Sequence, residues 1–295
     1  MALTKLRRPE NVAGDFYVDS RCIDCDLCRQ IAPSVFGQEG DQSAVYHQPR
    51  DADQEFAAMK ALITCPTASI GTTKRHAARD VVAAYPELID GDVYFCGFAS
   101  ESSYGASSYL IVRPEGNVLV DSPRFAAPLV KQISELGGIE LMFLTHRDDV
   151  ADHAKWAQRF AARRVMHADD VGWDTKSVEL SLRGRGAVAL DEGLLAIPTP
   201  GHTRGHTVLL YCNKYLFSGD HVWWSDDRHE LSASSSVCWY SWEEQTVSME
   251  KLARYGFEWV LPGHGRRAHA NPEQMRRYVE ACAVRMSARR KRTVG

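Results

Sequence analysis

Histidines and aspartates recur in three short turns of the sequence, and side chains of these types bind divalent metal ions. The turns read THRDDVADH (145–153), PGHTRGH (200–206, with FSGD at 217–220 after it) and PGHG (262–265). Each turn follows an apolar stretch that is typical of a β-strand. Glycines allow the chain to turn sharply at strand ends, where imidazoles and carboxylates can meet at one edge of a sheet. The pattern therefore predicts a site for two divalent metal ions.

Cysteines form a second group near the start of the chain. Cys22, Cys25 and Cys28 lie in CIDCDLC, and Cys65 precedes a proline in CPTASIG. Three thiols at this spacing wrap three corners of an iron–sulfur cubane, and Cys65 supplies the fourth corner. Zinc is the alternative, although zinc ribbons usually pair two Cys-x-x-Cys hooks. The two segments resemble those of single-cluster ferredoxins, which implies one 4Fe-4S cluster bound by these four cysteines.

Two kinds of sequence flank these motifs. Up to about residue 75, short strand-like and helical stretches form a module that cannot bury much apolar surface and needs a metal or cluster to hold it together. From about residue 80, longer apolar strands alternate with helical stretches, as in a mixed domain of strands and helices. The sequence thus predicts a domain over residues 1–76 and a second over residues 77–295.

Composition narrows the class of protein and its partners. The 295 residues are 44% hydrophobic and 25% charged, with a formal net charge of -3, so no basic field favours nucleic acid as a partner. No apolar run is long enough to cross a bilayer, and no apolar segment typical of a signal peptide follows the first basic residues. We expect a cytoplasmic protein whose partner is a small-molecule substrate, with neither nucleic acid nor membrane as a partner.

From about residue 90, the order of the motifs is similar to that of the metallo-β-lactamase superfamily. The motifs are the strand NVLVDS, the histidine loop, GHTRGH, FSGD and PGHG. The resemblance implies an α+β fold, an αββα metallo-β-lactamase sandwich, behind a small ferredoxin-like N-terminal domain. It also implies that His146 and His202 bind a first metal ion, and that Asp152, His153 and His264 bind a second. Asp220 would bridge the two ions. Asp121 would support the ligands from behind, and His206 would orient the hairpin through a hydrogen bond.

The first histidine loop departs from the family pattern His-x-His-x-Asp-His. Asp148 replaces the second histidine, and two extra residues precede Asp152 and His153. An acidic ligand favours harder ions, and a similar substitution occurs in the diiron flavodiiron proteins of the same superfamily. We therefore count Asp148 as a metal ligand, with the N-cap of the next helix as its alternative role. Asp149 is the rival ligand, because it lies four residues before His153 and would share its helix face.

The resemblance implies metal-dependent hydrolysis, in which two metal ions, zinc or iron, activate a bridging hydroxide and Asp152 accepts its proton. The first alternative is a diiron oxidoreductase that receives electrons from a redox partner through the cluster. The sequence contains neither a flavodoxin-like domain nor a glycine-rich flavin loop, which counts against this oxidoreductase alternative. The second alternative is a redox sensor without enzymatic activity. Aromatic residues in the segment 239–242 lie where this fold builds its substrate rim, although core packing is their commoner role.

Overall fold

We describe the fold from a computed structural model that covers residues 2–293. The chain divides into two compact units, the first formed by residues 1–140 and 151–161 and the second by residues 141–150 and 162–295. The boundary predicted between residues 76 and 77 lies within the first unit and stays a prediction. Among the described residues, none of the helices combines the length and the apolar character needed to span a bilayer.

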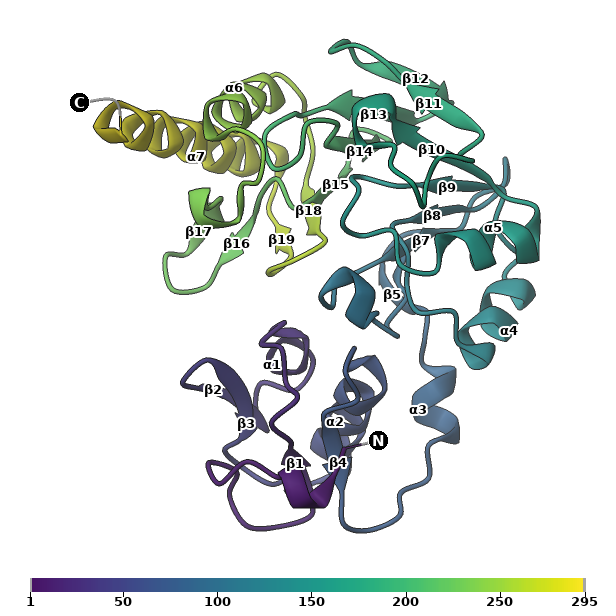
Figure 1. Cartoon of the computed structure of the whole chain (residues 1–295), viewed down its shortest axis with the longest axis vertical. Coiled ribbons are helices and arrows are strands. Elements are labelled where there is room, and N and C mark those ends of the chain that lie inside the picture. The colour runs from purple at the N-terminus through teal and green to yellow at the C-terminus, as the bar shows by residue number, and fades with distance from the viewer. Residues whose placement is uncertain (1, 294–295) are drawn as a thin grey trace. The chain divides into compact units, whose positions relative to one another are not determined.

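The N-terminal part of the first unit is built from two small antiparallel strand pairs and two helices. β1 (Phe16–Val18) pairs with β4 (Ile70–Thr72), and β2 (Phe36–Glu39) pairs with β3 (Gln42–Val45) (Figure 1). The helices are α1 (Leu27–Ile31) and α2 (Ala52–Thr64). The Asp51 carboxylate caps α2 by accepting a hydrogen bond from the Gln54 backbone at 2.8 Å. A small core that includes Phe16, Val35 and Ala58 joins these elements.

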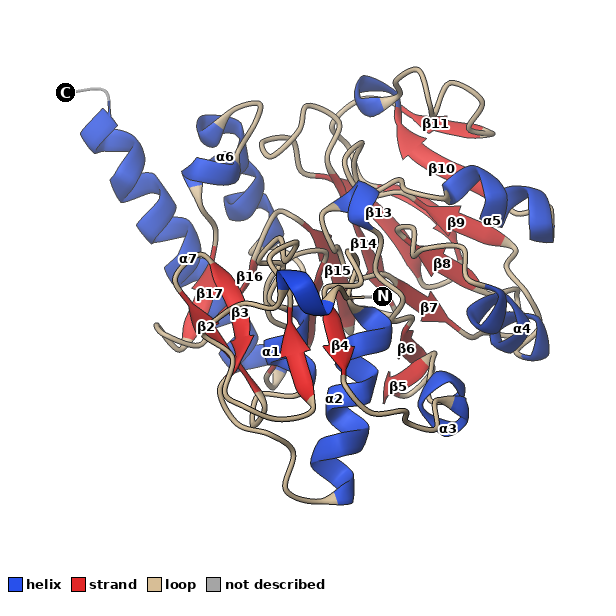
Figure 2. Cartoon of the chain, turned by 60° about the horizontal axis from the view of Figure 1, so that its bottom comes forward, coloured by secondary structure: helices blue, strands red, loops and turns tan. Residues whose placement is uncertain are grey.

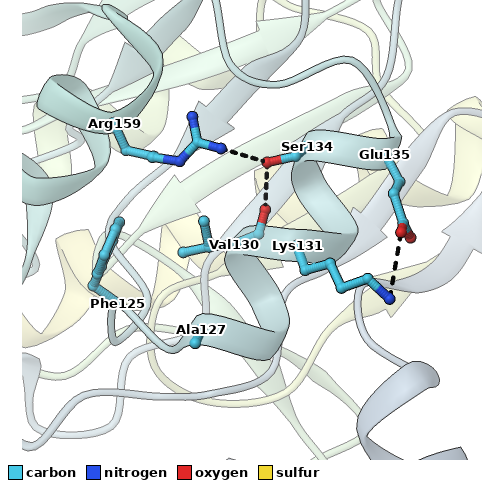
Figure 3. A pocket seen from close by; sticks show the side chains of 7 residues that line it. All are labelled: Phe125, Ala127, Val130, Lys131, Ser134, Glu135 and Arg159. Carbon is cyan, nitrogen blue, oxygen red and sulfur yellow. Dashed lines mark hydrogen bonds and ion pairs between the residues drawn. The ribbon is translucent and has the colours of Figure 1, made fainter.

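The rest of the first unit contains four antiparallel strands in the order β8 (Val118–Val120), β7 (Tyr109–Ile111), β6 (Val93–Phe95) and β5 (Glu87–Asp90). Its helices are α3 (Arg79–Ala83), the short η2 (Glu101–Ser103), α4 (Ala127–Glu135) and α5 (His153–Phe160). The fully buried Trp156 anchors α5, because its indole N–H donates to the Pro123 carbonyl at 2.9 Å. Figure 3 shows an open hollow beside α4, where Arg159 donates a hydrogen bond to Ser134.

The second unit is organised around a six-stranded sheet. Its order is β12 (Val188–Asp191), β13 (Leu194–Pro198), β14 (Thr207–Tyr211), β15 (Tyr215–Gly219), β18 (Trp259–Pro262) and β19 (Ala268–His269). All neighbours are antiparallel except β15 and β18, which run parallel. Strands β14 and β15 are buried along their whole length, as their continuous apolar sequences lead one to expect.

Two helices cover one face of this sheet. They are α6 (Trp242–Leu252) and α7 (Pro272–Thr293), which lie side by side in Figures 1 and 2. Their buried Met249, Leu252 and Met275 join Val208 and Leu216 of the sheet in one hydrophobic core. The unit also holds the parallel strands β9 (Leu141–Phe143), β10 (Arg163–His167) and β11 (Leu180–Leu182), and the hairpin of β16 (Trp223–Ser225) and β17 (Glu230–Ser232). Strands and helices thus form an α+β architecture, as the sequence predicts.

Candidate metal centre and iron–sulfur site

Four of the predicted ligands follow the ends of strands in the second unit. His146 follows β9, His202 lies between β13 and β14, Asp220 follows β15, and His264 follows β18. Because β15 and β18 pair in parallel, their ends bring Asp220 and His264 together. The His264 backbone N–H donates to Asp220 Oδ1 at 3.1 Å, and His264 Nδ1 lies 2.9 Å from both carboxylate oxygens. The strand-end placement predicted for these residues is the one observed.

Two overlapping groups of side chains could each hold a cation. One group contains His146, Asp148 and His202, and the other contains His146, Asp149 and Asp220; within each, the ligand atoms lie within 4.8 Å of one another. His146 Nε2 lies 3.7 Å from Asp220 Oδ2, which is also 3.7 Å from His202 Nε2. Ligands about 2.0–2.2 Å from a shared zinc ion lie roughly 3–4 Å from each other. The donor atoms therefore have the spacing of a metal site.

Hydrogen bonding supports this interpretation. Nε2 of the fully buried His146 has no hydrogen-bond partner, while Nδ1 lies 2.9 Å from the Thr145 hydroxyl, which fixes the orientation of the ring. The buried Oδ2 of Asp148 and both ring nitrogens of His202 also lack partners. Buried polar atoms without partners are rare, and a bound cation would satisfy His146 Nε2, Asp148 Oδ2 and His202 Nε2. The residues present thus fit a divalent metal ion.

Electrostatics place the donors in the right protonation state. Burial lowers the pKa of His146 to about 4, so that its imidazole is neutral, as a metal ligand must be. Burial acts to raise the pKa of Asp220, but the adjacent His264 outweighs it and holds that pKa well below its usual value. The nearby His202 imidazole likewise lowers the pKa of Asp148. The carboxylates are therefore ionised at neutral pH.

The structure brings both Asp148 and Asp149 into the site, although the sequence presents them as rivals. The Asp148 side chain is 35% exposed, whereas Asp149 is 1% exposed. Neither aspartate caps the next helix, because α5 begins at His153 and its N-cap is Asp152. The prediction that Asp148 could cap the helix is therefore wrong. The prediction that Asp149 shares a helix face with His153 is also wrong, because Asp149 precedes the helix. A β carbon at Gly263 would lie 2.7 Å from Asp149 Oδ2, so only glycine leaves room for this carboxylate.

Asp152, His153 and His264 belong to neither group, but His264 contacts Asp220 directly, whereas no contact of Asp152 with these donors is observed. The Asp152 carboxylate accepts a hydrogen bond from the Phe125 backbone at 2.8 Å and pairs with Lys155 Nζ at 2.6 Å. The two extra residues in this loop shift Asp152 and His153 to the start of α5, and Asp149 enters the second group. The ligand and base roles of Asp152 stay predictions that rest on the resemblance alone.

Sequence reasoning missed Asp170, which is buried at the end of η3 (Ala168–Asp170). Its carboxylate accepts hydrogen bonds from the Arg147 backbone at 3.2 Å, from the Gly205 backbone at 2.6 Å and from the Thr203 hydroxyl. It therefore joins the loop that carries His146 to the turn that carries His202. No motif marks Asp170, because its partners are distant in sequence.

Two further residues surround the donors. His206 is buried and is engaged by hydrogen bonds, since its Nδ1 lies 2.9 Å from the Thr199 hydroxyl and its Nε2 accepts from the Asp220 backbone at 3.2 Å. It thus has the orienting contacts that the resemblance implies. Trp239 is 61% exposed, its backbone N–H donates to the His202 carbonyl at 2.9 Å, and its ring centroid lies 6.1 Å from the His202 ring. An exposed aromatic face thus borders the metal ligands.

The four N-terminal cysteines line one small cavity whose other walls are largely apolar. Asp24 and Asp26 adopt left-handed conformations with φ of 55° and 66°, which lets the loop wrap around the cavity, and Arg29 pairs with both carboxylates. Burial raises the pKa of Cys25 to about 12 and raises that of Cys28 as well. A cluster that binds thiolates would therefore displace protons from these thiols. The converging cysteines fit such a cluster.

Residues 18–72 match the family model described as the 4Fe-4S single cluster domain of Ferredoxin I. Over 139 residues, the chain is 29% identical to a protein of Bacillus subtilis (strain 168) named YmaE, covering 45% of this chain and 51% of that protein. Over 115 residues it is 32% identical to hydroxyacylglutathione hydrolase of Salmonella paratyphi C, covering 38% of this chain and 45% of the relative. The chain thus spans about half the length of the curated relatives it matches.

Solved structures share the fold of the larger part. The structure of VMB-1 has a TM-score of 0.52 at 18% identity and covers 68% of this chain and 96% of that one. The DIM-1 metallo-beta-lactamase has a TM-score of 0.51 at 16% identity, covering 67% and 95%. The protein therefore has a metallo-β-lactamase fold. Residues 18–72 match a single-cluster 4Fe-4S ferredoxin domain, so that the predicted fold and the predicted ferredoxin domain are both confirmed.

Proposed function

We propose that this protein is a metal-dependent hydrolase of a small-molecule substrate, with a dinuclear centre held by three histidines and three aspartates. They are His146, Asp148, Asp149, His202, Asp220 and His264. One observation carries the proposal: Asp220 Oδ2 lies 3.7 Å from Nε2 of both His146 and His202, while Nδ1 of His264 lies 2.9 Å from each oxygen of the same carboxylate. These contacts support a bridging role for Asp220 between two ions about 3.5–4 Å apart.

The donor set determines what the residues contribute. Because metal ligands bind in their deprotonated form, three carboxylates and three imidazoles would contribute three negative charges, and two divalent ions would keep a small positive excess. That excess attracts an anionic or polarised group of a substrate. Two divalent ions bound there would supply a hydroxide at neutral pH and polarise the bond to be cleaved. Asp170 holds the two ligand loops together, so that their donors do not need to reorganise.

The surroundings of the site favour an acyl substrate with an apolar portion. Trp239 offers an exposed aromatic face beside His202, on which an apolar group could stack. One relative bears the name hydroxyacylglutathione hydrolase, and hydrolysis of an ester or thioester agrees with the polarising role of the centre. We therefore propose esters and thioesters as the first substrates to test.

The experiment compares the parent protein with Asp220→Asn and with Asp226→Asn, an exposed control. Asp226 forms an ion pair with Arg266 at 2.8 Å and lies outside both cation-binding groups. All three proteins are purified anaerobically and assayed for zinc and iron and for hydrolysis of a panel of esters and thioesters. We expect Asp220→Asn to lose at least one metal ion and most of the turnover, and Asp226→Asn to retain both. Two ions per chain in Asp220→Asn, beyond those of the cluster, would contradict the bridging role.

A second candidate function is a diiron oxidoreductase that receives electrons through the cluster. The observation that favours it is the presence of three carboxylates among six donors, because carboxylates favour harder ions such as iron. The metal assay separates the two functions. Zinc in the centre with turnover that needs no reductant supports hydrolysis, whereas iron with turnover that requires a reduced electron donor supports the oxidoreductase.

A further inference from the structure

Gly105 lies directly against the cluster ligand Cys25. A β carbon at Gly105 would lie 2.6 Å from Cβ of Cys25, 3.0 Å from its Sγ and 3.1 Å from Cγ of Pro66, the residue after ligand Cys65. Contacts this short leave no room for any side chain at this position. Gly105 lies outside residues 18–72, which match the ferredoxin family model, but belongs to the same compact unit. A residue beyond the ferredoxin domain therefore touches the cluster site.

The turn that carries Gly105 is tightly wound. Its hydrogen bonds run from the Tyr104 backbone to Glu101, from Gly105 to Ser100 and from Ala106 to Ser103, at 3.0, 2.9 and 2.8 Å. Tyr104 and Gly105 are both left-handed, with φ of 49° and 84°, a conformation that non-glycine residues adopt only at a cost. Ser103 is fully buried, while the Tyr104 side chain is 72% exposed. The backbone N–H groups are thus satisfied within the turn, and a bare α carbon faces Cys25.

The same turn carries a negative charge. Glu101 is the first residue of η2 (Glu101–Ser103), and its side chain is exposed to solvent. The turn that places Gly105 against Cys25 therefore also holds a carboxylate that can be removed without disturbing a buried contact.

We propose that the turn from Ser100 to Ala106 forms one wall of the 4Fe-4S site, so that the cluster is held by a composite site that extends beyond the ferredoxin domain. A wall of backbone and small side chains keeps water from the sulfur of Cys25. Solvent access and nearby charge set the potential and the oxygen sensitivity of such a cluster. The proposal does not depend on the chemistry of the metal centre.

The test compares Gly105→Ala with Gly40→Ala in the full-length, anaerobically reconstituted protein. Gly40 is a matched control, because it is also left-handed with φ of 66°, but nothing lies within 4 Å of an added β carbon. Iron and acid-labile sulfide, the electron paramagnetic resonance spectrum of the reduced cluster and the rate of bleaching in air are measured. We expect Gly105→Ala to bleach several-fold faster, or to lose cluster content, with a shifted spectrum, while Gly40→Ala resembles the parent. Equal behaviour of the two variants would overturn the proposal.

If both alanine variants misfold and lose the cluster, two surface substitutions test the proposed wall instead. Glu101→Gln removes a negative charge from the proposed wall, and Glu115→Gln removes one from the exposed turn between β7 and β8 of the same unit. Removal of a nearby negative charge favours the reduced cluster, which carries one more electron. We expect Glu101→Gln to raise the midpoint potential and Glu115→Gln to leave it unchanged. Unchanged potentials in both variants would overturn the proposal.

Discussion

The carboxylate of Asp170 accepts a hydrogen bond from the backbone N–H of Gly205 at 2.6 Å, and a β carbon at Gly205 would lie 2.8 Å from that of Asp170. This close approach is open only to glycine. With its bonds to the Arg147 backbone and the Thr203 hydroxyl, one buried side chain fixes the spacing between two loops that carry predicted metal ligands. We therefore expect Asp170 to affect the proposed metal centre by positioning the loops of His146 and His202.

We expect Asp170→Asn to lower both stability and metal affinity. The amide replaces one acceptor oxygen with a donor that faces other donors, at a cost of about 1–3 kcal/mol in the free energy of unfolding. Asp169→Asn is the matched control, because the Asp169 side chain is 47% exposed. Thermal unfolding and metal titration check the prediction. A loss of stability with unchanged metal affinity would reduce Asp170 to a purely structural role.

Both Asp148 and Asp149 should be required for a full metal complement. From the sequence, Asp148→Ala is expected to lower metal content and Asp149→Ala is not, but the structure places both carboxylates among the donors. We therefore expect each substitution to deplete the centre, because each removes a carboxylate from the proposed donor set. Elemental analysis of the two variants measures this. Normal metal content in either one would remove that aspartate from the ligand set.

Asp152→Asn serves as the contrasting substitution. Asparagine keeps one acceptor oxygen for the Phe125 backbone but loses the ion pair with Lys155, which is exposed and contributes little. We expect a change of less than about 1 kcal/mol in the free energy of unfolding and an unchanged metal content. Loss of metal from Asp152→Asn would restore the ligand role that the resemblance implies.

The sequence predicts those parts of the site whose signals are local. The cysteines of the cluster lie within short segments, and the ligands at strand ends follow from the strand patterns and the glycines beside them. The position of Asp149 beside His146 and Asp220 has no such signal, because spacing alone does not tell whether the two extra residues lengthen the loop or enter the helix. Asp170 and Gly105 carry no local signal at all, since their roles arise from contacts with residues far away in the chain.

Stability of the first unit should depend on pH through His76. Its Nε2 lies 2.6 Å from Asp15 Oδ2 and its Nδ1 lies 2.7 Å from Glu55 Oε1. Burial acts to lower the pKa of His76, but these two carboxylates outweigh burial and raise the pKa above the ordinary histidine value of about 6.5. The protonated ring therefore stabilises the fold below about pH 6.5, and this contribution is lost as pH rises through the folded pKa.

We expect the melting temperature of the parent to fall between about pH 6.5 and pH 8 more than that of His76→Ala. Asp15→Asn combined with Glu55→Gln should flatten the same dependence, because it removes the groups that raise the pKa. Differential scanning calorimetry across this range checks both variants. Parallel curves for the parent and His76→Ala would show that His76 does not carry the dependence.

Cys65→Ala separates the two candidate functions. Cys65 is the only predicted cluster ligand outside the cysteine loop, so its loss should leave a three-iron or empty site while the ligands of the metal centre remain chemically intact. If the protein is a hydrolase, ester or thioester turnover should persist at a comparable rate once the stability of the variant is matched to the parent. If it is an oxidoreductase, turnover with a reduced electron donor should collapse although both metal ions are still bound. We expect hydrolysis to survive. Activity that requires a reductant in the parent and disappears in Cys65→Ala, with the centre still fully loaded, would instead establish the cluster as the point where electrons enter.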